Sequence, residues 1–539
     1  MLSLTFYGGA NGIGGNKILL EDGDSRLFLD FGTDFAQRYH YFEEYLNPRP
    51  GLGLLDFLEM GLLPPLEGIY RRDLDPDGSI LASYTSSPLY REVDVEGVLL
   101  SHAHLDHSGY ISFLKGDIPI YSSAMTAFVA KAVQDSGKGD MEKEVCYLTP
   151  REHVFPKLGK DKQDGEGALR AANSKKVNAR QRPFYLFDCN ELTPGARRFW
   201  ADTPGARDLD SRSPTPVEGI GPLRLRNFPL DHSVPGACAY AVETSLGWVV
   251  YTGDLRWHGR QGQLTRDFVQ SASQLRPAVL IGEGTNAPQD ADAPPGPCFT
   301  EEAVFAKALE AVRGTRGLVI ADFGARNVER LLTFRETAGL TGRRLVILAR
   351  DAYLLEAMGY LTPSIPNIAQ DPLLAIYHDS KSNLDRWERG IRERHRAKLV
   401  TPQQIHQMQG DYVLCFSFFD INELPQVRPK EGSAYIYSSS EAHNEEQEMD
   451  VRRLQNWLRH FDIRGIGLPV KGEIPVEERG LHASGHASAA ELVELIRGIH
   501  PRVFVPVHTE NADYFVSGLA GSGIQVRVPQ WGERMEFRQ

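Results

Sequence analysis

The segment of the sequence with the clearest chemical potential is Ser101–His107, which reads SHAHLDH and follows the apolar stretch VEGVLL. That stretch predicts a buried strand, which argues against a histidine-rich surface loop. In an extended chain, residues two apart point the same way, so His102 and His104 can reach one metal ion together. Asp106 and His107 lie where the chain turns toward a helix and can face a second ion. Imidazole and carboxylate ligands without a thiolate suit Zn²⁺, with Mn²⁺ as the alternative.

Further side chains of the ligand type stand at the ends of later apolar segments. His232 follows LRLRNFPL, Asp254 follows WVVYTG and His508 follows RVFVPV. Taken alone, each is more readily explained as a core histidine or a turn aspartate. Added to the four ligand-type residues of the 102–107 run, they suffice for two metal ions with Asp254 as a bridge. Two such ions can lower the pKa of a water toward about 7 and clamp a phosphate. Asp30, at the end of RLFLD, is a candidate for orienting a ligand, with a turn aspartate as the alternative.

The elements that must position these residues change in character along the chain. Short apolar segments between glycine or aspartate turns predict three strands within residues 1–35. From about residue 298, strands and helices alternate, which is typical of a parallel sheet, and Thr300 is a suitable N-cap for the first helix. The last 60 or so residues, rich in histidine at their start, return to the first part. We therefore expect one α/β domain inserted late into another.

Three segments carry weaker signals. Residues 36–92 contain the breakers PRPG, LPP and LDPDG and are interpreted as an insertion or lid. The basic stretch 155–183 is interpreted as a mobile surface loop, with nucleic-acid contact as the alternative. The basic run 386–398 is compatible with tracking a phosphate backbone. Its interspersed acidic residues favour a solvated helix face.

The bulk composition sets broad limits on the function. The chain has 539 residues, enough for at least two domains, and its net charge of −12 argues against non-specific coating of nucleic acid. A nuclease is still allowed, because metals and a local basic groove can supply the attraction. The sequence shows neither a long apolar run nor a signal-peptide pattern, so no membrane association is expected. Five isolated cysteines suggest neither a disulfide framework nor a cysteine zinc site, which fits a cytoplasmic location.

Taken in order, these motifs resemble those of metallo-β-lactamase-fold hydrolases and of their β-CASP nuclease subgroup. The matching positions are Asp30, the run 102–107, His232 and Asp254 for the fold, then Glu283, His486 and His508 for the subgroup. The segments HSVPGACAYAVET, YTGDLRWHG, HASGHAS and FVPVHTE are similar to ribonuclease J-like proteins. The resemblance covers nearly the whole chain.

The resemblance implies a metallo-β-lactamase αββα sandwich with an inserted α/β β-CASP cap domain. The metallo-β-lactamase core would occupy residues 1–294, with insertions near 36–92 and 155–215. The cap would occupy 295–478, and residues 479–539 would return to the core. The nucleic acid would lie in a groove between the cap and the metal domain.

The resemblance also implies residue roles. The expected metal ligands are His102, His104, Asp106, His107, His232, Asp254 and His508. Asp106 and Asp30 would serve catalysis at the metals. His486, held by Glu283, would contact the scissile phosphate or protonate the leaving oxygen, and a histidine there is typical of RNA-cutting members. His482 and Ser484 match positions that hold a substrate phosphate in ribonuclease J.

We therefore expect a two-zinc ribonuclease acting on single-stranded RNA, by 5′-3′ exonucleolytic cleavage, internal cleavage or both. A DNA nuclease of the same family and a small-molecule ester or thioester hydrolase are the alternatives, while the complete ligand set disfavours an inactive scaffold. Leu105 departs from ribonuclease J, which usually carries a glutamate there. The chain ends soon after His508, without room for the C-terminal domain that supports ribonuclease J dimers. A homodimer is therefore left open.

Overall fold

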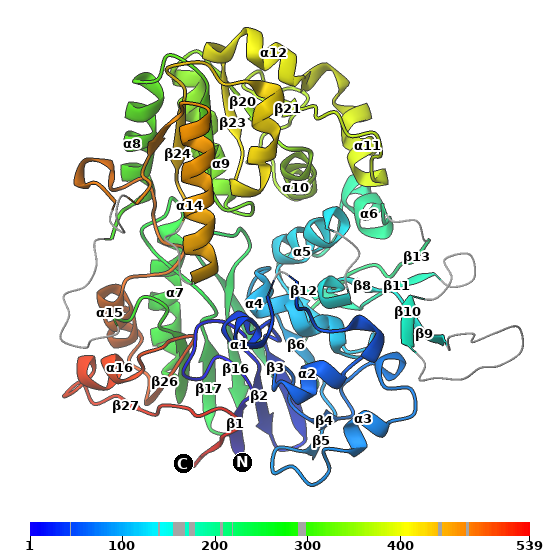
Figure 1. Cartoon of the computed structure of the whole chain (residues 1–539). Helices are drawn as coiled ribbons and strands as arrows, with labels where there is room; N and C mark the ends of the chain where they lie inside the picture. The colour runs from blue at the N-terminus through cyan, green and yellow to red at the C-terminus, as the bar shows by residue number, and fades with distance from the viewer. Residues whose placement is uncertain are drawn as a thin grey trace, which may run out of the picture.

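The computed structural model describes residues 1–43, 45–137, 141–154, 168–171, 178–204, 208–217, 219–288, 298–439, 445–469 and 474–538. Figure 1 shows two stacked parts, with the segment near residues 300–460 above and both chain ends together at the bottom of the lower part. The ends meet because the last strand pairs antiparallel with the first, Leu4 opposite Met535.

The lower part is built on two sheets. Within the described ranges, the first has eight strands, in the order β14 (Thr215–Pro216), β12 (Phe184–Leu186), β7 (Ile120–Ser122), β6 (Gly97–Leu99), β3 (Ser25–Leu29), β2 (Ile18–Asp22), β1 (Leu2–Phe6) and β28 (Arg534–Phe537). The second has six strands in the same ranges, in the order β15 (Leu225–Pro229), β16 (Cys238–Thr244), β17 (Gly247–Tyr251), β18 (Val279–Glu283), β26 (Val503–Val507) and β27 (Gln525–Val526).

Strand residues alternate between two cores, as period-2 geometry requires. In β3, Leu27 and Leu29 face the core between the two sheets, whereas Phe28 joins the core on the other side of its sheet. In β26, Val505 faces the inter-sheet core, and Phe504 packs with the helices α7 (Gly262–Leu275) and α15 (Ala489–Ile499). Helices thus cover the outer faces of two packed sheets, which confirms the predicted αββα sandwich.

The upper part is the β-CASP cap. Seven parallel strands of its described residues form one sheet, in the order β22 (Leu399–Val400), β21 (Leu374–Tyr377), β20 (Arg344–Ile347), β23 (Tyr412–Cys415), β19 (Val319–Asp322), β24 (Ala434–Tyr437) and β25 (Arg464–Ile466). Its helices include α8 (Glu301–Arg313), α9 (Val328–Leu340), α10 (Ala349–Gly359), α11 (Arg386–Arg394), α12 (Pro402–Gln407), α13 (Leu424–Val427) and α14 (Glu445–His460). Thr300 caps α8 through its side chain, as predicted.

The cap is an insertion between two neighbouring strands of the lower part. β18 and β26 pair in parallel, with Ile281 opposite Val505, although the whole cap lies between them in sequence. This topology fits a domain inserted late into another. The boundaries at 294/295 and 478/479 stay predictions.

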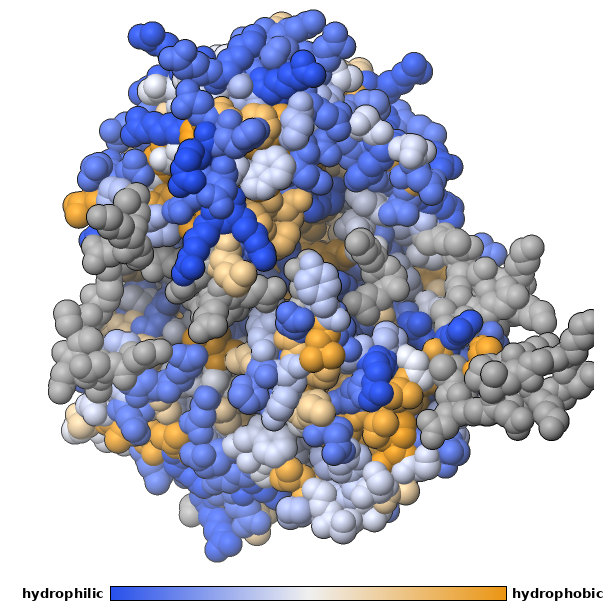
Figure 2. Space-filling view, in the orientation of Figure 1, coloured by the Kyte–Doolittle hydropathy of each residue, from blue (hydrophilic) through white to orange (hydrophobic). Residues whose placement is uncertain are grey.

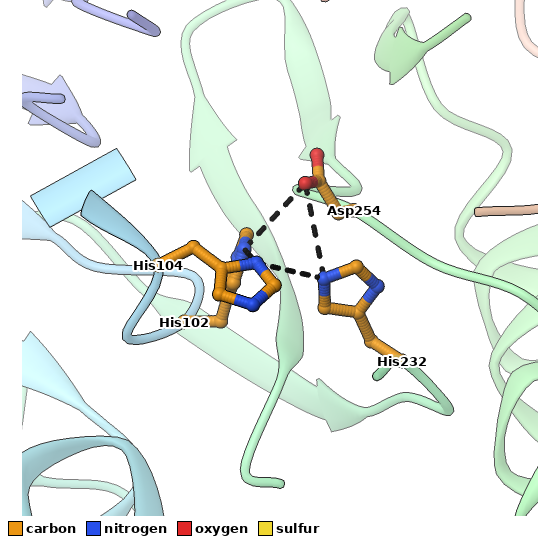
Figure 3. Close-up of side chains that lie close together, drawn as sticks. All are labelled: His102, His104, His232 and Asp254. Carbon is orange, nitrogen blue, oxygen red and sulfur yellow. Dashed lines mark hydrogen bonds and ion pairs between the residues drawn. The ribbon is translucent and has the colours of Figure 1, made fainter. Parts of the chain in front are cut away.

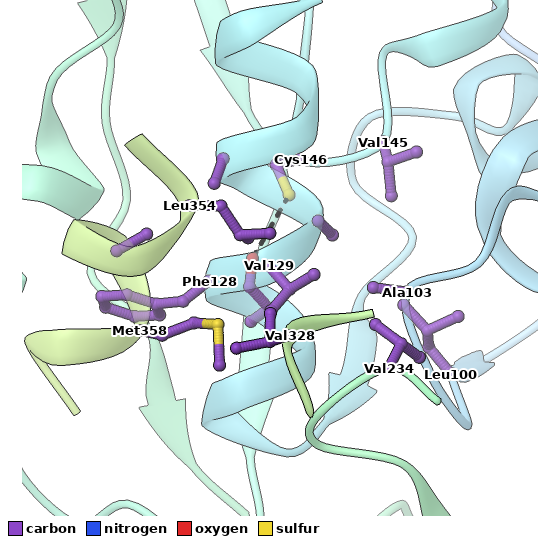
Figure 4. Packing of buried hydrophobic residues seen from close by; sticks show 14 of the residues in the cluster. Leu100, Ala103, Phe128, Val129, Val145, Cys146, Val234, Val328, Leu354 and Met358 are labelled. Atoms are coloured by element: carbon purple, nitrogen blue, oxygen red, sulfur yellow. Dashed lines mark hydrogen bonds between the residues drawn. The ribbon is translucent and has the colours of Figure 1, made fainter. Parts of the chain in front are cut away.

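A hydrophobic seam joins the cap to the lower part. Helix α5 (Ala124–Ser136) packs against α10, and Figure 4 shows Phe128 and Val129 of α5 close to Leu354 and Met358 of α10. The Tyr353 hydroxyl of α10 also donates to the buried Asp135 of α5 at 2.9 Å. The cap is therefore attached by core packing as well as by its two chain connections.

Residues 36–92, the segment interpreted as an insertion or lid, contain regular secondary structure and part of the core, and whether they form an insertion stays a prediction. This segment contains α1 (Phe35–Tyr41), α2 (Leu55–Glu59), α3 (Ser79–Ala82) and the paired strands β4 (Leu66–Glu67) and β5 (Arg91–Glu92). It supplies many fully buried apolar residues to the largest core, among them Leu54, Phe57, Leu63, Leu66 and Leu74. Sequence analysis did not predict these helices because breaker residues interrupt the segment and each helix is too short to show a helical period of apolar residues.

The basic stretch 155–183 also differs in part from its interpretation as a surface loop. Residues 155–167 and 172–177 lie outside the described residues, but β10 (Ala168–Ala171) and β11 (Ala179–Gln181) are strands. Arg182 is fully buried and donates to the carbonyl oxygens of Leu114 and Lys115. Its guanidinium is therefore a structural clamp.

The surface adds two observations. In α11, Arg392 pairs with Asp379 and Glu388, but Arg392 and Glu388 are buried, so this side of the helix is not the predicted solvated face. Figure 2 shows a mostly hydrophilic cap on this side, with strongly hydrophilic side chains gathered over α14. No helix among the described residues combines the length and apolar character needed to cross a membrane.

Candidate metal centre

Four predicted ligands converge in a first cluster, His102, His104, His232 and Asp254 (Figure 3). The Nε2 atom of His102 lies 3.1 Å from Nδ1 of His104, which lies 3.2 Å from Nε2 of His232. Oδ2 of Asp254 is 3.5 Å from His102 Nε2 and 3.9 Å from His232 Nε2. One nitrogen or oxygen of each residue therefore faces a common point.

A second cluster combines Asp106, His107, Asp254 and His508. His107 Nε2 is 3.1 Å from Asp254 Oδ2 and 3.7 Å from Asp106 Oδ2. His508 Nε2 is 3.2 Å from Asp106 Oδ2 and 3.8 Å from Asp254 Oδ2. The structure thus brings all seven predicted ligands together, and Asp254 belongs to both clusters.

The unsatisfied atoms of the site fit metal ions. Neither carboxylate oxygen of Asp254 forms a hydrogen bond among the described residues, and neither does Nε2 of His107, although all three atoms are buried. A buried carboxylate without hydrogen bonds is costly unless a cation neutralises it. Imidazoles and carboxylates at these separations suit zinc, and manganese is the alternative.

The predicted ligands stand at the same edge of the sandwich because parallel strands end there. His102 follows β6, Asp254 follows β17 and His508 directly follows β26. The short helix α4 (Leu105–Ser108) carries Asp106 and His107. It lies so close to Gly32 that a Cβ there would be 1.6 Å from the backbone oxygen of Asp106. Only glycine permits this approach.

Asp30 holds one predicted ligand, His107, in place. Its Oδ2 lies 2.7 Å from Nδ1 of His107 and also accepts hydrogen bonds from Ser101 Oγ at 2.7 Å and Tyr251 OH at 2.6 Å. Asp30 has the left-handed backbone angle φ of 57°, as does His508 with 52°. Such angles in non-glycine residues are uncommon and concentrate at functional sites. Sequence analysis identified Asp30 but had no signal for Ser101 or Tyr251.

Glu283 and His486 form a pair beside the second cluster. His486 Nδ1 lies 2.9 Å from Glu283 Oε2, and Glu283 Oε1 accepts from the Leu255 backbone at 2.7 Å. Thr285, which sequence analysis missed, donates to Glu283 at 2.7 Å and lies 2.9 Å from His508 Nδ1. A single hydroxyl thus connects the pair to a predicted ligand.

Electrostatics separate the roles of the histidines. Burial lowers the pKa of His102 well below its usual value and that of His104 to about 4, so both rings are neutral and offer lone pairs. Burial also disfavours protonation of His486, but Glu283 and Asp254 raise the pKa of His486 to about 9. This ring is therefore a proton donor at neutral pH.

The loop with the predicted phosphate-binding residues reaches the first cluster. The Gly485 carbonyl lies 2.5 Å from His232 Nδ1, which leaves His232 Nε2 for the metal. Ser484 Oγ accepts from Asn286 and from the His486 backbone, each at 3.1 Å. His482 is partly buried on the same loop.

Arg326 is a further basic group at the site that no sequence motif indicated. It lies in the cap between β19 and α9, and its charge lowers the pKa of His104. Burial lowers the pKa of Arg326, while Asp106 raises it. Figure 4 shows Val328, two residues later, near Ala103 and Val234, beside the ligand loops. The neighbouring Glu329 binds Arg256 and accepts from the Arg260 backbone at 2.6 Å, which ties the start of α9 to the metal domain.

Comparisons with known proteins agree with this geometry. The family model "Zn-dependent metallo-hydrolase RNA specificity domain" matches residues 469–529. The chain is 25% identical over 515 residues to ribonuclease J of Mycolicibacterium smegmatis, covering 94% of this chain and 68% of the relative. It is 23% identical over 523 residues to ribonuclease J of Mycobacterium tuberculosis, with the same coverage. It is 22% identical over 311 residues to ribonuclease J2 of Bacillus subtilis, covering 56% of this chain and 49% of the relative.

A solved structure supports the fold. The crystal structure of a protein of unknown function from Enterococcus faecalis V583 matches with a TM-score of 0.65 and 21% identity, and the match covers 99% of each chain. Over most of its length the chain is therefore similar to ribonuclease J, and the comparisons support a metal-dependent hydrolase with the metallo-β-lactamase fold.

Proposed function

We propose that this chain is a ribonuclease that hydrolyses phosphodiester bonds of single-stranded RNA with two zinc ions. The observation that carries the proposal is Asp254, a buried carboxylate without hydrogen bonds among the described residues that belongs to both ligand clusters. The match of residues 469–529 to an RNA specificity domain, and the ribonuclease J relatives, favour RNA as the substrate.

When bound, the two metal ions would supply the Lewis acidity that makes a water nucleophilic at neutral pH and offsets charge on a phosphate. The first cluster would hold one ion through His102, His104 and His232. The second would hold the other through Asp106, His107 and His508, with Asp254 between the two. Manganese is the alternative to zinc for the same donor set.

His486 is proposed to donate a proton to the leaving oxygen. Its Nδ1 is engaged by Glu283, and we find no hydrogen bond of Nε2 with the described residues. The raised pKa of His486, about 9, keeps the ring protonated at neutral pH. Glu283 would then orient the ring and stabilise its charge as a positioning residue.

Three groups around the clusters are proposed to hold substrate phosphates. His482 and Ser484 lie on the loop that also carries His486. From the cap side comes the guanidinium of Arg326, for which we find no hydrogen bond or ion pair with the described residues. Hydroxyl, imidazole and guanidinium groups all donate to phosphate oxygens. Their arrangement would place the RNA strand between the cap and the metal domain. A cytoplasmic location and a homodimer stay predictions.

The proposal is tested by incubating the purified chain, with zinc or manganese, with a 5′-monophosphate RNA and its DNA counterpart. Both are labelled at the 5′ end. Cleavage of RNA alone is expected, and it should disappear in Asp106→Ala and His508→Ala variants. Single labelled nucleotides would identify 5′-3′ exonucleolytic cleavage, and internal fragments would identify endonucleolytic cleavage. Cleavage of DNA alone, or of neither strand, would overturn the proposal.

A further inference from the structure

A third group of ligand-type side chains lies outside the site described above. His258 follows the Asp254 segment, Cys298 precedes α8, and Glu491 lies in the first turn of α15. His258 Nδ1 is 3.4 Å from Cys298 Sγ and 3.4 Å from Glu491 Oε2, and the sulfur and that oxygen are 3.9 Å apart. These three residues come from three distant parts of the sequence.

We propose that His258, Cys298 and Glu491 form a third zinc site that connects the cap to the loop of residues 482–486. Zinc bonds of about 2.0–2.3 Å in tetrahedral geometry place ligand atoms roughly 3.3–3.6 Å apart. The three measured distances between the ligand atoms, 3.4, 3.4 and 3.9 Å, are close to this range. Cys298 is exposed, so water can complete the fourth position.

The orientation of His258 supports a ligand role. Its Nε2 donates to the Ser484 carbonyl at 3.0 Å, which directs Nδ1 toward the sulfur and the carboxylate. A second ring nitrogen bound to a backbone carbonyl is the usual arrangement for metal-ligating histidines. Glu491 is oriented too, because its Oε2 accepts from the Ser488 backbone at 2.7 Å.

Zinc binding at this site would release protons. A proton on Nδ1 of His258 and the Cys298 thiol proton would leave to solvent, while Nε2–H keeps its bond to the Ser484 carbonyl.

A cobalt-substituted full chain tests the proposal without relying on activity. The two clusters of the main site contain no cysteine, so a Co²⁺–thiolate charge-transfer band in the near ultraviolet would report on the third site alone. We expect the band in the wild type and in the matched control Cys189→Ser, and its loss in Cys298→Ser. Metal analysis should show one zinc fewer per chain in Cys298→Ser, with RNA cleavage retained.

A second measurement covers the case in which the variant fails to fold. Alkylation of wild-type Cys298 by iodoacetamide, followed by peptide mass spectrometry, should be fast in chelator and at least about tenfold slower in zinc, since a ligating thiolate is shielded. Cys189 should show no such zinc dependence. Absence of the band in excess cobalt, or alkylation of Cys298 at equal rates with and without zinc, would overturn the third site. The triad would then be a hydrogen-bonded cluster only, while the main site would be unaffected.

Discussion

Replacing Asp30 by asparagine should weaken zinc binding without removing any ligand. In the wild type, three donors converge on Oδ2 of Asp30, and the Ser101 backbone donates to Oδ1 at 2.7 Å. Asparagine keeps the shape but places an NH₂ group at one of these positions. The hydroxyls of Ser101 and Tyr251 can rotate to accept from it. The imidazole of His107 can only do so by moving its proton to Nε2.

That tautomer change sets the size of the expected loss in zinc affinity. Nε2 of His107 is the atom that faces Asp254 and Asp106, and a protonated nitrogen cannot bind a metal. Loss of such an orienting partner typically costs 10–100-fold in metal affinity, which is about 1.4–2.7 kcal/mol. We expect a loss of this size at the second cluster and a parallel fall in RNA cleavage at limiting zinc.

The assay is a zinc titration against a competing chelator, with thermal unfolding measured on the same samples. Asp22→Asn is the matched control, because Asp22 binds Ser245 on the surface and touches no ligand. A folded Asp30→Asn variant with wild-type affinity for both ions would refute the role assigned to Asp30.

Four further changes test other parts of the account. Glu283→Gln removes the charge that raises the pKa of His486, so the alkaline fall in kcat/KM, expected near pH 9 in the wild type, should move to lower pH. Arg326→Ala should raise KM for RNA by roughly tenfold or more, because a charged phosphate contact is worth about 1.5–3 kcal/mol. Phe128→Ala should destabilise the chain by about 3–5 kcal/mol and loosen the cap, as a fully buried ring is lost from the seam. Burial raises the pKa of Asp322 from 3.8 to about 7, so wild-type stability should fall as pH rises through this window, by at most about 4 kcal/mol, and Asp322→Asn should flatten the curve.

The Glu283, Arg326 and Asp322 variants each have an outcome that would contradict the reasoning. An unchanged pH profile in Glu283→Gln, compared with the same change at Glu494 on α15, would remove the pair from the mechanism. Arg326→Lys should restore part of the affinity, and an alanine variant with normal KM would contradict the contact. Chemical denaturation measures the stability changes. Equal pH dependence of the wild type and Asp322→Asn would assign the titration to another group.

Much of the fold and of the candidate site could be predicted from local patterns in the sequence. Strands with apolar residues on both faces, such as β3 and β26, are easy to predict from sequence. The residues that follow them are predicted metal ligands or their partners, and they lie close together because parallel strands end at one edge. The spacing of His102, His104 and His107 after an apolar strand was enough to predict a metal-binding run. The family resemblance added Glu283 and His486, which no spacing rule connects.

Other features depend on contacts between distant segments, which local pattern does not encode. Short helices and turns in residues 36–92 hide a buried core, and Arg182 in a basic stretch is a buried clamp. Isolated cysteines argued against a cysteine zinc site. Cys298 nevertheless meets His258 and Glu491 because the cap and the last helix return to the same place.

The most direct test of the central claim is RNA cleavage as a function of zinc equivalents in chains with and without Asp254. The Cys298→Ser background restricts the count to the two clusters. We predict that cleavage rises to its maximum at two zinc ions per chain, and that Asp254→Ala abolishes it and loses tight binding of both ions. Full cleavage in Asp254→Ala, or saturation of activity at a single ion, would contradict a two-metal site bridged by this carboxylate.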